Sequence, residues 1–388
     1  MSTKPIQLID QSKKWLSHEV YPLWSEKGLD LKYGGFVESI SFDGSPMDVP
    51  RRAMVQARQI YAFLTGAKMG CCPQDVASSA IEQGTRYMME RFSDSSGAFI
   101  YSVHPDGTPK SRTPDLYTQA FALFGLAQAY SLNPRPEYKE CAKTLLKYLH
   151  NERRVAGGGY TEVDDNGTVS YKSNPHMHLF ESAVAWMQID SDPEWKDLGH
   201  ELITLCLNKF INPQSHVLGE YFDEQWNHLL QNGVFIYEPG HQYEWAWLMS
   251  LYEDLTGQSL KSVRHQLFLL AEEHGTSPER KVVFDEMWSN YMPKTRSSRF
   301  WPQCERIKAA VRLGCEVSGE DQARYAKAAD ESLTTLFKFF ETPMKGLWYD
   351  MLSAEDTFSG SSAKASSLYH IVNAMEEYVN LRPKLTGF

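Results

Sequence analysis

The sequence predicts an all-α fold, a closed ring of six helical hairpins or (α/α)6 barrel, with short β-turn or hairpin segments at one mouth. The first observation behind this prediction is a polar residue that recurs about every sixty positions: Arg58, Tyr117, His178, His241, Glu305 and His370. The steps between these residues are 59, 61, 63, 64 and 65 positions. A spacing this regular indicates one structural unit repeated six times, each copy directing a functional group toward a common centre.

A second feature recurs with the same period. Short segments that combine glycine with aromatic residues occupy positions 33–40, 96–103, 157–163, 218–224, 281–288 and 345–352. Each is typical of a turn followed by two or three extended residues, too short to form the core of a sheet. We therefore expect them to connect helices at one mouth of the ring.

The third observation is that the helical stretches between these segments are of two kinds. One kind is rich in alanine and aromatic residues with few charges, as expected for helices buried on most sides: 54–67, 116–130, 178–187, 243–255, 307–317 and 367–379. The other kind, exemplified by 136–154 and 321–340, carries one apolar stripe and a charged face, which is typical of an outer layer. We predict six pairs, each an inner helix followed by an outer helix.

The period favours a closed ring over an open solenoid. It exceeds the usual repeat of about 20–50 residues in solenoids, which also need polar caps at both ends. No composition shift or Pro/Ser-rich linker divides the chain, so we predict a single catalytic domain over residues 1–388. The stretch 357–367, rich in serine, is expected to be a loop at the barrel mouth.

Charge and composition exclude several classes of partner. The net charge is −10 with no basic run, which excludes nucleic acid and anionic membrane surfaces as partners. The N-terminus lacks the apolar core of a signal peptide, and no apolar run is long enough to span a membrane. The 6 cysteines form no disulfide or metal framework. We expect a cytoplasmic protein that is a monomer or homodimer.

Two of the recurring histidines start helices in the same way. In NPHMHLFE, Asn174 is a candidate N-cap, and His178 and Glu181 share a helix face because they are three positions apart. In EPGHQYEW, His241 and Glu244 repeat this spacing after another proline. The repetition in register with the sixty-residue period favours a functional role over a structural one.

The recurring set combines groups suited to moving protons with groups suited to binding hydroxyls. Imidazole moves protons near neutral pH, and carboxylates with a guanidinium bind hydroxyl groups through charge-assisted hydrogen bonds. A metal site is the alternative, since His and Glu at this spacing occur in di-iron bundles, although there in the opposite order. The chain has no HExxH motif, paired cysteines or glycine-rich phosphate loop, so no metal and no cofactor are expected.

At these motifs the chain resembles the N-acylglucosamine 2-epimerase superfamily. The resemblance covers nearly the whole chain and rests on ARQ around Arg58, then YTQAFAL, NPHMH, EPGHQYEW, WPQCE and KASSLYH. It implies an (α/α)6 barrel, in agreement with the repeat count. It also implies a sugar isomerase or epimerase that shifts a proton between C1 and C2 through a cis-enediolate without a metal.

The resemblance assigns unequal roles to the recurring residues. His241 and His370 would be the acid/base pair, supported by His178 at the ring oxygens and by Arg58 at the developing enediolate charge. The remaining positions would orient hydroxyls or stack on the sugar: Tyr117, Asn174, Glu244, Trp301, Glu305 and Trp348.

The product is left open between two outcomes. The aromatic-rich EPGHQYEWAW segment resembles the mannose isomerase branch, which implies a monosaccharide substrate and interconversion of D-mannose and D-fructose. A sugar 2-epimerase of N-acylglucosamine or cellobiose type is the alternative. No second basic cluster accompanies Arg58 in the sequence, which argues against phosphorylated or sulfonated sugars.

A glycoside hydrolase is the alternative from another class, because the same barrel hosts inverting glycosidases. These use two carboxylates separated by about 6.5–9.5 Å. Asp115, Glu181, Glu244, Glu305 and Asp350 are the candidates for such a pair. A glycosidase has no need of three inward histidines, so this alternative is the weaker one.

Overall fold

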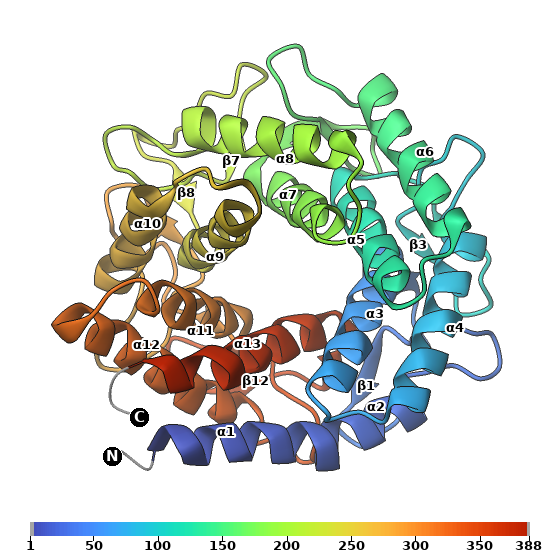
Figure 1. Ribbon diagram of the computed structural model, residues 1–388, viewed down its shortest axis with the longest axis horizontal. Coiled ribbons are helices and arrows are strands. Elements are labelled where there is room, and N and C mark those ends of the chain that lie inside the picture. Colours follow the sequence, from blue (N-terminus) through green and yellow to red (C-terminus); the bar gives the residue numbers. More distant parts are fainter. Residues whose placement is uncertain (1–3, 386–388) are drawn as a thin grey trace.

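Inner and outer helices form two concentric rings around one axis, as Figure 1 shows. The computed structural model describes residues 4–385. Within that range the inner ring has six helices: α3 (Ala53–Lys68), α5 (Leu116–Leu132), α7 (Ser173–Met187), α9 (Pro239–Thr256), α11 (Trp301–Gly314) and α13 (Leu368–Leu381). Each packs against the next, and α13 returns to α3, which closes the ring. The predicted all-α barrel is confirmed.

The outer ring departs from the prediction in the sixth unit. Its first members follow their inner helices as expected: α4 (Gln74–Phe92), α6 (Pro136–Glu152), α8 (Pro193–Leu205) with the π-helical turn η2 (Cys206–Phe210), α10 (Lys261–His274) and α12 (Gly319–Phe339). In the described chain α13 is followed only by the short turn η4 (Arg382–Lys384). The outer position beside α13 is filled from the N-terminus by α1 (Lys4–Trp15), which continues through η1 (Leu16–Val20) into α2 (Tyr21–Lys27).

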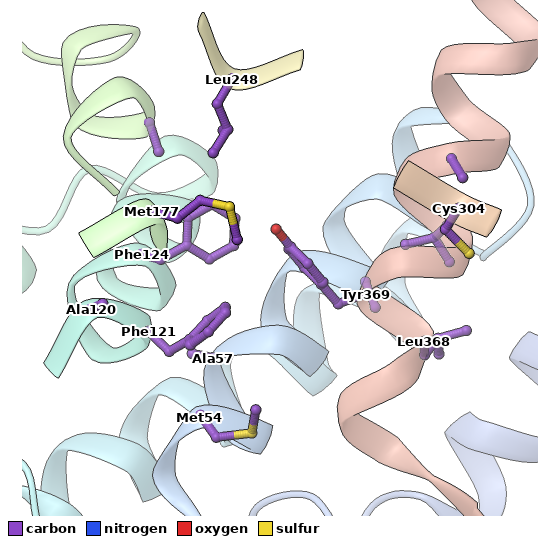
Figure 2. Close-up of a cluster of buried hydrophobic side chains, with 14 of the residues drawn as sticks. Met54, Ala57, Ala120, Phe121, Phe124, Met177, Leu248, Cys304, Leu368 and Tyr369 are labelled. Carbon is purple, nitrogen blue, oxygen red and sulfur yellow. The ribbon is translucent and has the colours of Figure 1, made fainter. Parts of the chain in front are cut away.

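The inner helices are buried around most of their circumference, which explains why most of them carry few charges. Gly125 shows how closely they approach, because a Cβ at this position would lie 2.8 Å from the Cβ of Ala57. Large side chains fill the barrel axis. Tyr369 reaches inward from α13 toward Phe121 and Phe124 of α5 (Figure 2), with ring centroids 6.0 and 5.8 Å away. No helix within residues 4–385 is long and apolar enough to cross a membrane.

The strands gather at one mouth of the barrel, as predicted. All those described lie between the end of an outer helix and the start of the next inner helix, and they form small antiparallel sheets. These are β2–β3–β4 (Arg51–Arg52, Ser102–Val103, Pro109–Ser111), β5–β6–β7 (Glu162–Val163, Val169–Lys172, Tyr221–Phe222), β8–β9 (Ile236–Tyr237, Met287–Trp288), β10–β11–β12 (Ser298–Arg299, Met351–Leu352, Phe358–Ser359) and β1–β13 (Ser39–Ser41, Ser362–Lys364).

The pairing of β1 with β13 joins the first and last mouth segments and closes the ring there as well. The serine-rich stretch 357–367 contributes β12, β13 and the turn η3 (Ala365–Ser367) to this mouth. Its predicted position at the mouth, as opposed to a linker, is confirmed.

A recurring side-chain contact ties five of the six glycine–aromatic loops to the inner helix that follows each of them. Gln56 on α3 accepts from the backbone N–H of Phe36 at 2.7 Å and donates to its carbonyl at 2.9 Å. Gln119 on α5 does the same with Phe99. Equivalent contacts to the preceding loops are made by His176, Gln242 and Gln303. In these units the loop and the helix share one period because hydrogen bonds from the helix hold the loop that precedes it.

Candidate active site

A cavity of about 450 Å³ opens at the mouth where the inner helices begin. Its walls contain eight of the ten residues predicted to form the site: Arg58, Tyr117, Asn174, His178, His241, Glu244, Trp301 and His370. These residues come from all the inner helices, and the start of each helix carries its side chain to the mouth. The structure therefore brings the recurring positions together in one place, with Glu305 directly behind His370.

Each cavity histidine is held by a carboxylate at Nδ1. A glutamate in its carboxylate form can only accept a hydrogen bond, which places a proton on Nδ1 of its partner and leaves Nε2 for the cavity. The pairs are His178 with Glu181 at 3.0 Å, His241 with Glu220 at 2.9 Å and His370 with Glu305 at 2.8 Å.

His241 lies in a negative environment. It is buried, which by itself lowers the pKa of an imidazole, but the carboxylates of Glu220, Glu238 and Glu244 outweigh this effect. Together they raise the pKa of His241 to about 9. This imidazole is therefore protonated at neutral pH.

His370 lies in the opposite environment. Burial holds its pKa well below the ordinary value, and the positive charges of Arg58 and Lys308 act in the same direction. Burial likewise lowers the pKa of His178 to about 3, again with Arg58 contributing. The cavity thus presents one protonated and two neutral imidazoles.

Trp301 lies beside both the protonated His241 and the neutral His370. Its ring centroid lies 5.0 Å from that of His241 and 5.7 Å from that of His370. Trp301 is the first residue of α11 and packs closely over the start of α9, where a Cβ on Gly240 would lie 2.5 Å from its ring. A flat aromatic surface between a proton donor and a proton acceptor suits a sugar ring or chain.

The guanidinium of Arg58 is fixed among aromatic rings. It donates to the Tyr117 hydroxyl at 2.7 Å and to the Ser366 carbonyl at 3.3 Å. It also lies 4.2 Å from the ring centroid of Phe121. A cation held this rigidly in a buried wall is suited to stabilising negative charge on substrate oxygens.

Two polar groups on the wall are available for substrate hydroxyls. Glu244 Oε1 and Asn174 Oδ1 have no hydrogen-bond partner among residues 4–385. The expectation that Asn174 caps its helix is wrong, because α7 already begins at Ser173 after the extended residue Lys172. Asn174 lies instead in the first turn, with its amide at the cavity wall.

Two predicted site residues do not line the cavity. Glu305 is fully buried and hydrogen-bonds to His370, which lines the cavity. Trp348 is also fully buried, and its ring stacks on Trp24 with centroids 5.2 Å apart. The expectation that Trp348 stacks on the sugar is therefore corrected, because its ring is used to pack the N-terminal segment onto the barrel.

His241 and Glu244 share the face that lines the cavity, but the hydrogen-bond partners of the two histidines differ, since only His178 bonds to the glutamate three positions later. The partner of His241 is Glu220, which lies 21 positions earlier in the glycine–aromatic loop before α9. Glu244 faces the cavity from the following turn of α9. The sequence did carry one signal for Glu220, since it lies in LGEYFDE, one of the recurring glycine–aromatic segments.

Three basic side chains that the sequence analysis did not identify also line the mouth of the cavity. Arg52, Arg299 and Lys364 come from the strands that precede inner helices, and each is paired with a carboxylate. Hydrogen bonds join Arg52 to Glu38 at 2.6 Å, Arg299 to Glu238 at 3.0 Å and Lys364 to Asp350 at 2.6 Å. The expectation that no second basic cluster accompanies Arg58 is wrong, because the fold assembles one from three distant segments.

Clustered donors in the site could also ligate a cation. Among the described residues, ligand atoms lie within 4.8 Å of one another in His178–Glu181–Glu244, in Glu220–Glu238–His241 and in Glu244–Glu305–His370. In each group the histidine Nδ1 is already bonded to a carboxylate of the site. The expectation of a reaction without metal stays a prediction.

A second cavity of about 400 Å³ adjoins the first and shares Arg52, Met54, Tyr117 and Asn174 with it. Its other walls are acidic. Burial and the neighbouring Glu162 raise the pKa of Asp115 to about 7. Asp115 thus belongs to the adjoining cavity, apart from the histidines.

Comparison with known proteins decides which family carries this arrangement. A family model described as N-acylglucosamine 2-epimerase (GlcNAc 2-epimerase) matches residues 34–374. The chain belongs to this family. It is therefore an enzyme that acts on sugars as an epimerase or isomerase.

Relatives within the epimerase family carry both kinds of activity in their names. The chain is 33% identical over 368 residues, 94% of each chain, to a mannose-6-phosphate isomerase of Rhizobium meliloti. It is 22% identical over 263 residues to a cellobiose 2-epimerase of Bacteroides fragilis, covering 62% of this chain and 64% of the other.

Solved structures show the same fold. A cellobiose 2-epimerase from Bacillus thermoamylovorans superposes with a TM-score of 0.85 at 18% identity, covering 97% and 99% of the two chains. A D-mannose isomerase superposes with a TM-score of 0.83 at 19% identity, covering 98% of each chain. An unsaturated glucuronyl hydrolase shares the fold less closely, with a TM-score of 0.68 at 12% identity. Membership of the epimerase family, not the fold, sets the glycosidase alternative aside.

Proposed function

We propose that this family member is an aldose–ketose isomerase that interconverts D-mannose and D-fructose. The observation that carries the proposal is the pair of imidazoles beside Trp301, one with its pKa raised and the other with its pKa lowered. A proton shift between adjacent carbons needs one group to take a proton and another to give one at the same pH.

The charge states assign the direction of each transfer. Neutral His370 removes the proton from C2 of the open-chain aldose, and Arg58 stabilises the negative charge that develops on the C1 and C2 oxygens. Protonated His241 then delivers a proton to C1, while the hydroxyl proton on O2 passes to O1. The sugar gains and loses no net proton, and the two imidazoles return to their starting states by exchange with solvent.

The charges at the mouth favour an uncharged sugar. Arg52, Arg299 and Lys364 each face a carboxylate, so little positive charge is left over for a phosphate group. Paired cations and carboxylates instead offer donors and acceptors for hydroxyl groups. We therefore propose D-mannose in preference to D-mannose 6-phosphate, although a relative is named for the phosphorylated sugar.

A sugar 2-epimerase is the second candidate, and the adjoining cavity is the observation that favours it. A space of about 400 Å³ that shares a wall with the first cavity has room for the second sugar of a disaccharide. In an epimerase the same histidines would return the proton to C2.

Product analysis separates these candidates. The protein is incubated with D-mannose, D-mannose 6-phosphate, cellobiose and N-acetylglucosamine, and the products are resolved by chromatography. We expect D-fructose from D-mannose and faster turnover of D-mannose than of its 6-phosphate. Conversion of cellobiose to its 2-epimer as the main activity would contradict the proposal.

A variant of His370 tests the assigned chemistry. His370→Ala is expected to lower kcat by about 10²–10⁴-fold, the usual contribution of a general base, with sugar binding retained in calorimetry. His150→Ala is the control, because His150 is exposed on the outer helix α6. Unimpaired turnover in the His370 variant would contradict the role of this residue.

A further inference from the structure

The most unusual charged residue outside the cavity is Lys308. It lies on α11, two turns from Trp301, and its side chain is fully buried. An ammonium group removed from water is strongly unfavourable unless a partner of opposite charge compensates it. Its surroundings therefore indicate what it does.

Lys308 is surrounded by carboxylates and aromatic rings. Its Nζ lies 2.5 Å from Glu305 Oε2 and 3.8 Å from the centroid of the Trp247 ring. Glu244 and Glu181 add negative charge, and with Glu305 they keep the pKa of Lys308 above the ordinary value even though burial opposes this. Lys308 is thus a permanent cation beneath the cavity.

Glu305 connects this cation to the proposed base. Its Oε2 faces Lys308, and its other oxygen, Oε1, lies 2.8 Å from Nδ1 of His370. Two successive contacts therefore join Lys308 and Glu305 on α11 to His370 on α13. The charged or titratable groups that act on His370 come from every neighbouring inner helix and include Arg58, His178, His241, Glu305 and Lys308.

We propose that Lys308 is a positioning residue that selects the tautomer of His370 by holding Glu305 as a carboxylate. As a carboxylate, Glu305 can only accept, so the proton of neutral His370 lies on Nδ1 and Nε2 faces the cavity as a base. As a carboxylic acid, Glu305 would donate to Nδ1. The proton of His370 would then lie on Nε2, and the imidazole could not remove a proton from the sugar.

Glu305 is poised for such a change. Burial and the neighbouring charge of Glu244 raise the pKa of its carboxyl well above the ordinary value, and Lys308 is the charge that opposes this rise. Loss of Lys308 removes this opposing charge and therefore raises the pKa of Glu305 further, which favours its protonated form. The inference rests on the proposed role of His370 as the base, but the tautomer itself can be measured without any sugar.

The direct test is 15N NMR of histidine-labelled protein without substrate, with the His370 signals assigned by difference from His370→Asn. The wild-type protein is expected to show His370 protonated at Nδ1, and Lys308→Met is expected to show it protonated at Nε2. Lys308→Arg retains the cation and is expected to keep the wild-type tautomer. An unchanged tautomer in Lys308→Met would overturn the proposal whatever the activity of the protein.

Kinetics give an independent test with a matched control. Lys308→Met is expected to lower kcat by about 10²-fold or more, within the range for loss of a general base, with a smaller effect on KM. Arg306→Met is the control, because Arg306 is a buried cation on the same helix that pairs with Glu272 outside the cavity. A loss in the control as large as that in Lys308→Met would show that any buried cation of α11 is needed for the fold, and would overturn the specific role.

A double variant shows whether Lys308 acts through Glu305. Glu305→Gln removes the group that Lys308 controls, so adding Lys308→Met to it is expected to lower kcat by less than threefold more. The double variant also removes both buried charges at once, so neither is left without its partner, which guards against a protein that fails to fold. If the losses in kcat of the two single variants multiply in the double variant, Lys308 does not act through Glu305 and the proposal is overturned. If the wild-type protein isomerises no sugar, the proposed function fails while the NMR test of Lys308 stands.

Discussion

His241 and His370 occupy the same phase of the repeat but differ in the charges that surround them. Three carboxylates act on His241, whereas Arg58 and Lys308 act on His370. Because a charged neighbour changes a pKa far more than helix position does, equivalent places in two repeats hold imidazoles whose pKa values are shifted in opposite directions. The contrast therefore follows from the charged side chains around each histidine and not from its place in the repeat.

The pH dependence of kcat/KM follows from these shifts. Activity requires His370 to be neutral, and its lowered pKa places the acidic limb well below pH 6.5. Activity also requires His241 to be protonated, so it is lost as the pH rises through about 9. We expect a plateau across neutral pH, measured as initial rates in overlapping buffers.

Glu220→Gln tests whether the carboxylate of Glu220 causes the raised pKa of His241. Removing this carboxylate lowers the pKa of His241, so the alkaline limb should move to lower pH while the acidic limb stays in place. Glu272→Gln, which alters a carboxylate paired with Arg306, should leave both limbs unchanged. An alkaline limb that does not move in Glu220→Gln would show that another group controls it.

At the residue scale, the sequence predicted which positions converge on the cavity but not which side chains pair with them. The sixty-residue period placed His178, His241 and His370 at one mouth because helix phase repeats with the unit. It could not show that His241 pairs with Glu220, since that contact joins a loop to a helix and has no fixed spacing. Arg52 and Lys308 were missed for the same reason, because their neighbours are set by tertiary packing.

At the element scale, the loops before the inner helices set the geometry of the mouth. Gln56 and Gln119 show how, because each fastens the preceding loop to the first turns of its helix. The sequence predicted the loops and the helices as two separate periodic features. Their connection was not predicted because glutamine in an apolar helix also has an ordinary solvent-facing role.

Gly240→Ala tests the packing of these helix starts. Its Cβ would lie 2.5 Å from the Trp301 ring, so the ring must move away from its place between the two histidines. A displacement of this size is expected to lower kcat/KM for D-mannose by about 10–100-fold. The measurement is steady-state kinetics, with thermal unfolding to confirm the fold.

Gly157→Ala is the matched control for this variant. A Cβ at Gly157 would meet only Trp226, at an ordinary contact distance of 3.8 Å, and no strained backbone is involved. Wild-type kinetics are expected. A Gly240→Ala protein with unchanged kcat/KM would show that the position of Trp301 is not important for turnover.

At the scale of the whole molecule, the N-terminal segment completes the ring. The sequence predicted six consecutive inner–outer pairs because its period cannot reveal which chain end covers the last inner helix. Trp24 and Trp348 stack where this segment meets the barrel, and Trp24 Nε1 donates to the Gly346 carbonyl at 3.1 Å. We propose that the chain is one domain, since the buried core runs from Leu8 on α1 to Tyr378 on α13.

Trp348→Ala distinguishes this closing role from sugar binding. Loss of a fully buried tryptophan is expected to lower the free energy of unfolding by about 3–5 kcal/mol, measured by denaturant titration. KM for D-mannose should stay unchanged at a temperature where the variant is folded. A raised KM with unchanged stability would instead support the stacking role that the sequence predicted.

The central claim is that two histidines, without a metal, move a proton between C2 and C1 of D-mannose. Its most direct test is incubation with D-mannose in D2O with EDTA, followed by NMR of the sugars. The account predicts D-fructose with one deuterium at C1, because the proton that His241 delivers exchanges with solvent. D-glucose labelled at C2 as the main product would contradict the isomerase, and activity that vanishes in EDTA and returns with a divalent cation would contradict the metal-free mechanism.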